Sequence, residues 1–253
     1  MRILLPPSET KSEGSLRTTL QFSDLLAPEL TAARRAIAEQ LVTFCARPTA
    51  RVRTAIGTSP RQDDELARNA RLFEAATAPA HDIYSGVLFD ALDLPSLPAA
   101  ARKRAHERVL VQSALFGVVR FADPIPAYRL SADSTLPKIG KPVTYWKQHL
   151  ATVLNPIADE ELIVDLRSGA YATFWKPSKD HVVVHVMQES NGKKVAVSHF
   201  NKATKGLLAR ELLKGAKQLS NPDAIATTLS AAGFDVELIL QRNEAQRLIV
   251  TID

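Results

Sequence analysis

The stretch "HVVVHVMQESNGKKVAVSHF", His181 to Phe200, decides the fold. Two runs of β-branched residues flank Asn191-Gly192, a pair that favours the tight turn of a β-hairpin. Similar runs occur elsewhere in the chain and predict further strands: "RILL" (2–5), "RVLVQSAL" (108–115), "ELIVDLR" (161–167), "FDVELIL" (234–240) and "QRLIVTI" (246–252).

Helical patterns separate several of these strands. Apolar residues recur at helical spacing from Leu30 to Phe44 and from Leu66 to Ala76, while Pro142 begins a third helix over 142–155. Asn201 caps a fourth over 201–219, and Asn221-Pro222 opens a fifth that ends at Gly233. Because some strands are joined by hairpins and others by helices, the sequence predicts an α/β protein with α+β character, in which helices flank a mixed sheet. With no internal repeat, residues 1–253 form one expected domain.

Composition sets limits on the function. Of the 253 residues, 45% are hydrophobic, no run of eighteen apolar residues occurs, and Pro6 and Pro7 interrupt the apolar amino terminus. We therefore expect a cytoplasmic protein without a membrane partner and, in solution, a monomer. The net charge of +5 favours anionic partners. The single cysteine, Cys45, ends a helical pattern and is expected to be buried.

A proline-braced segment is the first candidate for a site: "LFGVVRFADPIPAYRL", Leu115 to Leu130. Its apolar part predicts a strand or short helix that ends at Gly117. Pro124 and Pro126 stiffen the second half of the segment into an extended ribbon, which would present Tyr128 and Arg129 to a ligand at low entropic cost. The alternative is an ordered connection in which an arginine pairs with Asp123.

Two further segments combine a strand with the start of a helix. In "VDLRSGAYATFWKP" (164–177), backbone N–H groups at Ser168-Gly169 could hold an anion, although an ordinary helix cap explains the same pattern. In "SHFNKATKGLLAREL" (198–212), Lys202 and Lys205 share a helical face, where an anion would offset their repulsion; a solvated lysine face is equally compatible. The sequence has no metal-binding or cofactor-binding motif, so neither is expected.

Six segments together resemble the YaaA family of bacterial peroxide-stress proteins: "ILLPPSET", "YSGV", "GVVRFADPIPAYRL", "GKPVTYW", "SGAYATFWKP" and "SHFNKATKGLLAR". They occur in the family's order from residue 3 to about residue 210. The resemblance implies a cytosolic protein that limits free iron and DNA damage during hydrogen peroxide stress. It also implies a compact fold with a basic cleft that binds duplex or branched DNA. This chain departs from the family at two places. Glu9 stands where a lysine is usual, and residues Ala55 to Ala76 lack the Gly-hydrophobic-Gly hairpin expected of the family's helix-hairpin-helix-like element, which binds DNA.

The candidate site residues, which match the family except for Lys11 beside the first motif, divide into two groups. For contacts to DNA phosphates or a small anion, we expect Thr10, Lys11, Arg120, Arg129, Lys141, Lys176, Lys205 and Arg210. The alternative function is an enzyme that acts on a small anionic or nucleotide-like substrate in the same cleft. Its candidates are Asp123 as base, Tyr128 or Tyr171 as proton donor, and Ser168 and Lys202. A third interpretation makes the matching polar residues a buried structural network.

Overall fold

A mixed β-sheet forms the centre of the molecule. The computed structural model describes residues 1–177, 181–190, 193–196, 199–241 and 244–252. Strand β1 (Arg2–Leu5) lies between two parallel neighbours, β3 (Val109–Ser113) and β6 (Ile163–Asp165). The sheet continues from β6 through two further parallel strands, β7 (Val182–Ser190) and β10 (Gln246–Ile252).

Antiparallel strands complete the sheet. They are β4 (Gly117–Arg120) beside β3, β8 (Lys193–Ala196) beside β7, and β9 (Asp235–Ile239) beside β10. The predicted hairpin is thus confirmed in β7 and β8, while its turn at Asn191-Gly192 lies outside the described residues. A small second sheet pairs β2 (Thr77–Pro79) with β5 (Pro124–Pro126), so the proline-braced segment is extended as expected. The predicted mixed α/β fold is confirmed.

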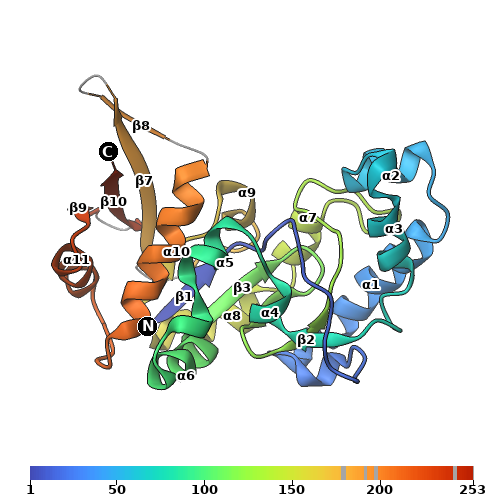
Figure 1. Ribbon diagram of the computed structural model, residues 1–253, viewed down its shortest axis with the longest axis horizontal. Coiled ribbons are helices and arrows are strands. Elements are labelled where there is room, and N and C mark those ends of the chain that lie inside the picture. Colours follow the sequence, from blue (N-terminus) through green and yellow to red (C-terminus); the bar gives the residue numbers. More distant parts are fainter. Residues whose placement is uncertain (178–180, 191–192, 197–198, 242–243, 253) are drawn as a thin grey trace.

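Helices cover the sheet and extend beyond it (Figure 1). Figure 1 shows α1, α2 and α3 grouped at one end of the molecule, with α11 beside β9 and β10 at the other. Among the described residues, none of the helices combines the length and apolar character needed to cross a bilayer. The helices are α1 (Thr31–Cys45), α2 (Ala50–Ile56), α3 (Asp63–Ala70), α4 (Ala80–Ile83), α5 (Val87–Leu92), α6 (Ala99–Arg108), α7 (Pro142–Lys147), α8 (Ala151–Glu160), α9 (Gly169–Ala172), α10 (His199–Lys214) and α11 (Pro222–Ala231).

Several element boundaries differ from the sequence prediction. The helix expected over 142–155 is two helices, α7 and α8, joined by a turn that keeps Leu150 buried. Helix α3 ends at Ala70 rather than Ala76, and α10 begins at His199, two residues before the expected cap. Gly117 begins a strand instead of ending one. Its φ of +74° suits glycine, and a Cβ there would lie 2.8 Å from the Trp146 ring.

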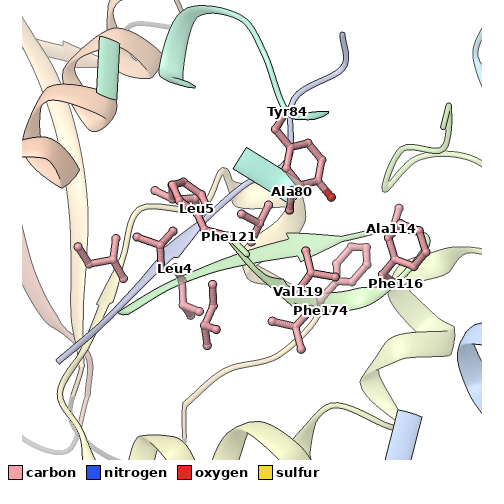
Figure 2. Packing of buried hydrophobic residues seen from close by; sticks show 14 of the residues in the cluster. Leu4, Leu5, Ala80, Tyr84, Ala114, Phe116, Val119, Phe121 and Phe174 are labelled. Carbon is pink, nitrogen blue, oxygen red and sulfur yellow. The ribbon is translucent and has the colours of Figure 1, made fainter. Parts of the chain in front are cut away.

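Aliphatic and aromatic side chains fill the core between the sheet and its helices. Figure 2 shows Leu4 and Leu5 of β1 packed near Val119, Phe121 and Phe174, all of them fully buried. The central parallel strands β1, β3 and β6 are mostly apolar, as expected for strands that are buried, and their polar residues Gln112, Ser113 and Asp165 are buried with them. Cys45 is buried as predicted, and burial raises the pKa of its thiol.

Candidate functional site

The topology of the sheet creates a crevice at one edge. β1 and β6 are adjacent and parallel, so their carboxyl ends lie at the same edge. From β1 the chain leads to β3 on one side, and from β6 it leads to β7 on the other. Loops that diverge from neighbouring parallel strands leave a crevice between them, the usual place for a ligand in such sheets.

A cavity of about 870 Å³ lies at this edge. β7 pairs with Asp165 at Val183 and then continues past the end of β6, so its following residues form one wall. Cavities of this volume accommodate small molecules. The other walls come from distant parts of the chain; the lining comprises 6–11, 85–89, 129–133, 165–172, 183–187, Asn201, Lys202 and Lys205.

The loop after β1 is fixed against the start of α5. The backbone N–H of Ser12 donates to the carbonyl oxygen of Ile83 at 2.9 Å, and Lys11 forms a β-bridge with Tyr84. Gly86 then begins α5 with a φ of +96°, and a Cβ at this position would lie 3.2 Å from Oγ1 of Thr10. The glycine therefore allows the two segments to approach closely enough to form a continuous wall.

Lys11 places its ammonium group inside this wall. Its Nζ donates to the carbonyl oxygen of Ser8 at 2.7 Å and lies 4.3 Å from the centroid of the Tyr128 ring. Burial, and next the charge of Arg129, lowers the pKa of Lys11 to about 7. Two cationic side chains are therefore close together at one side of the cavity.

The guanidinium of Arg129 lacks a close anionic partner among the described residues. It lies 3.5 Å from the carbonyl oxygens of Glu9 and Gly57, and 3.7 Å from the carboxylate of Glu9. Its Nε is buried without a hydrogen-bond partner. Buried donors are normally paired, so this group has unused capacity to bind an anion.

Asp165 and Arg167 form a buried pair at the end of β6. The guanidinium donates to both carboxylate oxygens, at 2.9 and 2.7 Å, and also to the side chain of Gln112 at 3.0 Å. Burial alone would raise the pKa of Asp165, but the hydrogen bonds and charge of Arg167 lower it overall. The ion pair of Arg167 is therefore short and buried, whereas that of Arg129 with the exposed Glu9 is 3.7 Å long.

Lys205 and His185 also line the cavity. Lys205 is only 8% exposed, and burial lowers the pKa of its amine to about 8 against the attraction of Asp165. His185 extends from β7, and burial followed by the charges of Arg247 and Lys205 lowers the pKa of its imidazole. Both groups therefore have access to their neutral forms near physiological pH.

The cavity carries an excess of positive charge. Among the described lining residues, five are lysine or arginine and three are acidic, with Asp165 and Arg167 neutralising each other. Tyr171 also faces this space, and burial, followed by the nearby Tyr128, raises the pKa of its phenol. No group of three or more histidine, cysteine or acidic side chains suited to a metal ion occurs within the part of the chain that the structure describes.

Comparison of the sequence with known proteins identifies the family of this chain. The family model described as "Peroxide stress protein YaaA" matches residues 1–238. A UPF0246 protein of Streptomyces coelicolor is 42% identical over 241 residues, covering 94% of this chain and 92% of the relative. A second UPF0246 protein, from Corynebacterium glutamicum, is 39% identical and covers 99% of this chain and 100% of the relative.

The chain belongs to the YaaA family of peroxide stress proteins. The resemblance deduced from its motifs is thus confirmed. More distant relatives include an uncharacterised protein of Campylobacter jejuni, 28% identical over 87% of this chain and 89% of the relative.

The structure of this YaaA-family protein brings together seven of the predicted site residues. They come from four separate segments and all line the cavity: Thr10, Lys11, Arg129, Ser168, Tyr171, Lys202 and Lys205. Lys202 and Ser168 are exposed, whereas Lys205 is buried. Their convergence is a fact of the fold, while their roles in binding or catalysis remain predictions.

Six predicted residues lie outside the cavity lining: Arg120, Asp123, Tyr128, Lys141, Lys176 and Arg210. The buried carboxylate of Asp123 accepts hydrogen bonds from the backbone N–H of Leu26 and from the backbone and side chain of Arg120, at 2.8 to 3.0 Å. These bonds close the turn between β4 and β5. The sequence of this segment allowed two interpretations, one of them an ordered connection in which an arginine pairs with Asp123. The structure contains that pair, between Arg120 and Asp123.

The other residues outside the lining divide by exposure. The Tyr128 hydroxyl is buried, 3.0 Å from that of Tyr84 and 2.8 Å from that of Ser113. Arg210 donates to carbonyl oxygens of Leu92 and Asp93 and so holds the end of α5. Lys141 and Lys176 are exposed at other places on the chain.

Four residues of the site were missed: Asn69, Asp165, Arg167 and His185. The first three are polar and buried. Asp165 and Arg167 had a usable signal, since an acid and an arginine two residues apart follow a buried apolar run at the end of a predicted strand. Nothing in the local sequence indicates that Asn69 contacts Arg129.

Proposed function

We propose that this peroxide stress protein binds a small anionic ligand, with a phosphate or carboxylate group, in the cavity beside β1 and β6. The observation that carries the proposal is the partly buried guanidinium of Arg129, which lines the cavity near Lys11, has an Nε without a hydrogen-bond partner, and lies 3.7 Å from its ion-pair partner Glu9. Cavities with apolar walls and a few convergent polar groups are typical ligand sites.

Electrostatics supports an anionic ligand. Burial and the charge of Arg129 disfavour the charged form of Lys11, and the charges of Glu65 and Glu9 oppose this effect without offsetting it. An anion between the two cations would remove their mutual repulsion and satisfy the free Nε donor. Since Arg167 is already paired, Arg129 is the arginine of this lining available for ligand binding.

Isothermal titration calorimetry tests this function with adenosine 5′-monophosphate and inorganic phosphate at low salt. Loss of one charge-assisted contact predicts affinity at least about tenfold weaker in Arg129→Gln than in the parent protein. Lys103→Gln is the matched control, because it removes an exposed cation of α6 outside the cavity. Equal affinities in all three proteins would contradict the proposal.

DNA binding that protects against iron-driven damage is a second candidate function. It is supported by the family membership, by the net charge of +5, and by the exposure of Lys141, Lys176 and Lys202, which leaves their ammonium groups accessible to phosphates. Binding of a labelled duplex should then weaken steeply with salt and fall when these three lysines become glutamine. Unchanged duplex binding in the triple variant would exclude these contacts.

A further inference from the structure

Lys205 differs from Lys202, the other lysine that α10 places in the cavity lining, in its surroundings. Its Nζ donates to the carbonyl oxygen of Arg167 at 3.0 Å, from a side chain that is 8% exposed and lines the cavity. The next residue, Gly206, packs so closely on α5 that a Cβ would lie 2.2 Å from the carbonyl oxygen of Leu88. This close packing holds Lys205 at the cavity wall, while Lys202, three residues earlier, is exposed.

The amine of Lys205 has a carboxylate nearby that is already engaged. Both oxygens of Asp165 accept hydrogen bonds from Arg167, which leaves its attraction for Lys205 too weak to offset burial. The pKa of Lys205 is therefore lowered to about 8. A buried lysine in this condition has a substantial neutral fraction near physiological pH, and a neutral amine is a nucleophile.

His185 supplies a proton-transfer group in the same space. It lines the cavity from β7, and the charge of Lys205 is one of the causes that lower the pKa of its imidazole. A neutral imidazole can accept a proton and return it. The cavity thus combines an amine, a neutral imidazole and, at Arg129, a free anion-binding group.

From this arrangement, and resting on the anion site proposed above, we infer that Lys205 forms a reversible imine with anionic ligands that also carry an aldehyde or ketone. The Nζ lone pair attacks the carbonyl carbon, and the carbonyl π electrons move to oxygen to give a carbinolamine. The nitrogen gives up two hydrogens, which leave with the oxygen as water while the C=N bond forms. We assign the transfer of these protons to His185, which lines the same cavity, and the step needs no oxidant or reductant.

Reductive trapping tests the inference with pyridoxal 5′-phosphate, which carries an aldehyde and a phosphate on one ring. The full-length protein is incubated with a substoichiometric amount of this probe and sodium cyanoborohydride, and the modified residue is identified by peptide mass spectrometry. Lys205 should be modified at least about tenfold faster than the exposed Lys202, because burial lowers the pKa of Lys205 to about 8 and so increases its neutral fraction. Excess pyridoxine 5′-phosphate, which lacks the aldehyde, should protect Lys205.

Two variants and one binding measurement separate the possible outcomes. Lys205→Arg keeps the charge, so it should bind pyridoxine 5′-phosphate but form no adduct, while Lys103→Gln, which removes an exposed lysine of α6 outside the cavity, should behave as the parent protein. If pyridoxine 5′-phosphate binds but Lys205 of the parent protein is not preferentially modified, the imine is excluded and the anion site stands. If pyridoxine 5′-phosphate does not bind and no adduct forms, both proposals are wrong. Identifying the modified lysine in the parent protein tests imine formation even if a variant fails to fold.

Discussion

The side chain of Asn69 holds the backbone of Arg129 by two reciprocal hydrogen bonds. Its Oδ1 accepts from the Arg129 N–H at 2.8 Å, and its Nδ2 donates to the Arg129 carbonyl oxygen at 2.7 Å. Asn69 is fully buried on α3, sixty residues away in sequence. An anion-binding arginine benefits from such a support because a fixed backbone reduces the entropy lost on binding.

Replacing Asn69 tests this support directly. Asn69→Ala leaves two backbone groups of Arg129 unpaired in a buried setting, so the free energy of unfolding should fall by about 1–3 kcal/mol. Anion affinity should fall as well, because Arg129 loses its position. Urea denaturation and titration calorimetry measure the two effects. Unchanged stability would mean that water or a rearranged loop satisfies these groups equally well.

The close contact between α10 and α5 predicts a contrast between two glycines. Gly206→Ala places a Cβ 2.2 Å from the Leu88 carbonyl oxygen, so the helices must move apart at a cost of about 1–3 kcal/mol. Gly215→Ala is the control, since a Cβ at that position meets no atom within 4 Å. Thermal denaturation of both variants checks the expectation. Equal melting temperatures would show that α10 is not closely held.

The buried pair at the end of β6 should be essential for stability. Arg167→Leu leaves Asp165 buried without its partner and should cost about 3–5 kcal/mol. Arg35→Leu breaks an exposed pair with Glu39 at 4.0 Å and should change stability by less than about 1 kcal/mol. If chemical denaturation gave the two variants similar stabilities, the buried pair would contribute little.

Anion affinity should decrease as the pH rises from 6 to 9. The pKa of Lys11 is about 7, in surroundings that include Arg129, Arg68, Glu9 and Glu65, and that of Lys205 is about 8 beside Asp165 and His185. A bound anion favours both ammonium forms, so binding raises both pKa values and takes up protons between pH 7 and 9.

Loss of these charges at high pH should weaken binding by about tenfold or more. Calorimetry in buffers of different ionisation enthalpy measures the proton uptake. A constant affinity and no proton uptake over this range would show that neither lysine contacts the ligand.

Much of the fold can be predicted from local sequence. β-branched runs such as "VVVHV" and the turn pair Asn191-Gly192 identify β7 and β8, and helical spacing identifies α1 and α11. Family motifs also indicate which segments meet at the cavity, since Thr10, Arg129 and Lys205 all lie in them. Such patterns report only local periodicity. The start of β4 at Gly117 and the break between α7 and α8 near Gln148 were mispredicted because they depend on long-range packing, in which Gly117 lies against Trp146 and Leu150.

The sequence does not predict which individual side chains point into the cavity. Neighbouring residues of an extended segment face opposite sides, so only one of Tyr128 and Arg129 could line the cavity, and the sequence does not say which. Lys202 and Lys205 share a helical face, yet only Lys205 is buried, because Gly206 brings that turn against α5. Asn69 reaches Arg129 from a distant helix, and Asp123 is occupied by its own loop.

The central claim is that Arg129 binds an anion inside the cavity beside β1 and β6. Crystals soaked in tungstate, a phosphate analogue that scatters anomalously, test it most directly. We predict an anomalous peak within hydrogen-bonding distance of the Arg129 guanidinium, present in the parent protein and absent from Arg129→Gln. Peaks confined to exposed lysines such as Lys141 and Lys176, with none in the cavity, would contradict it.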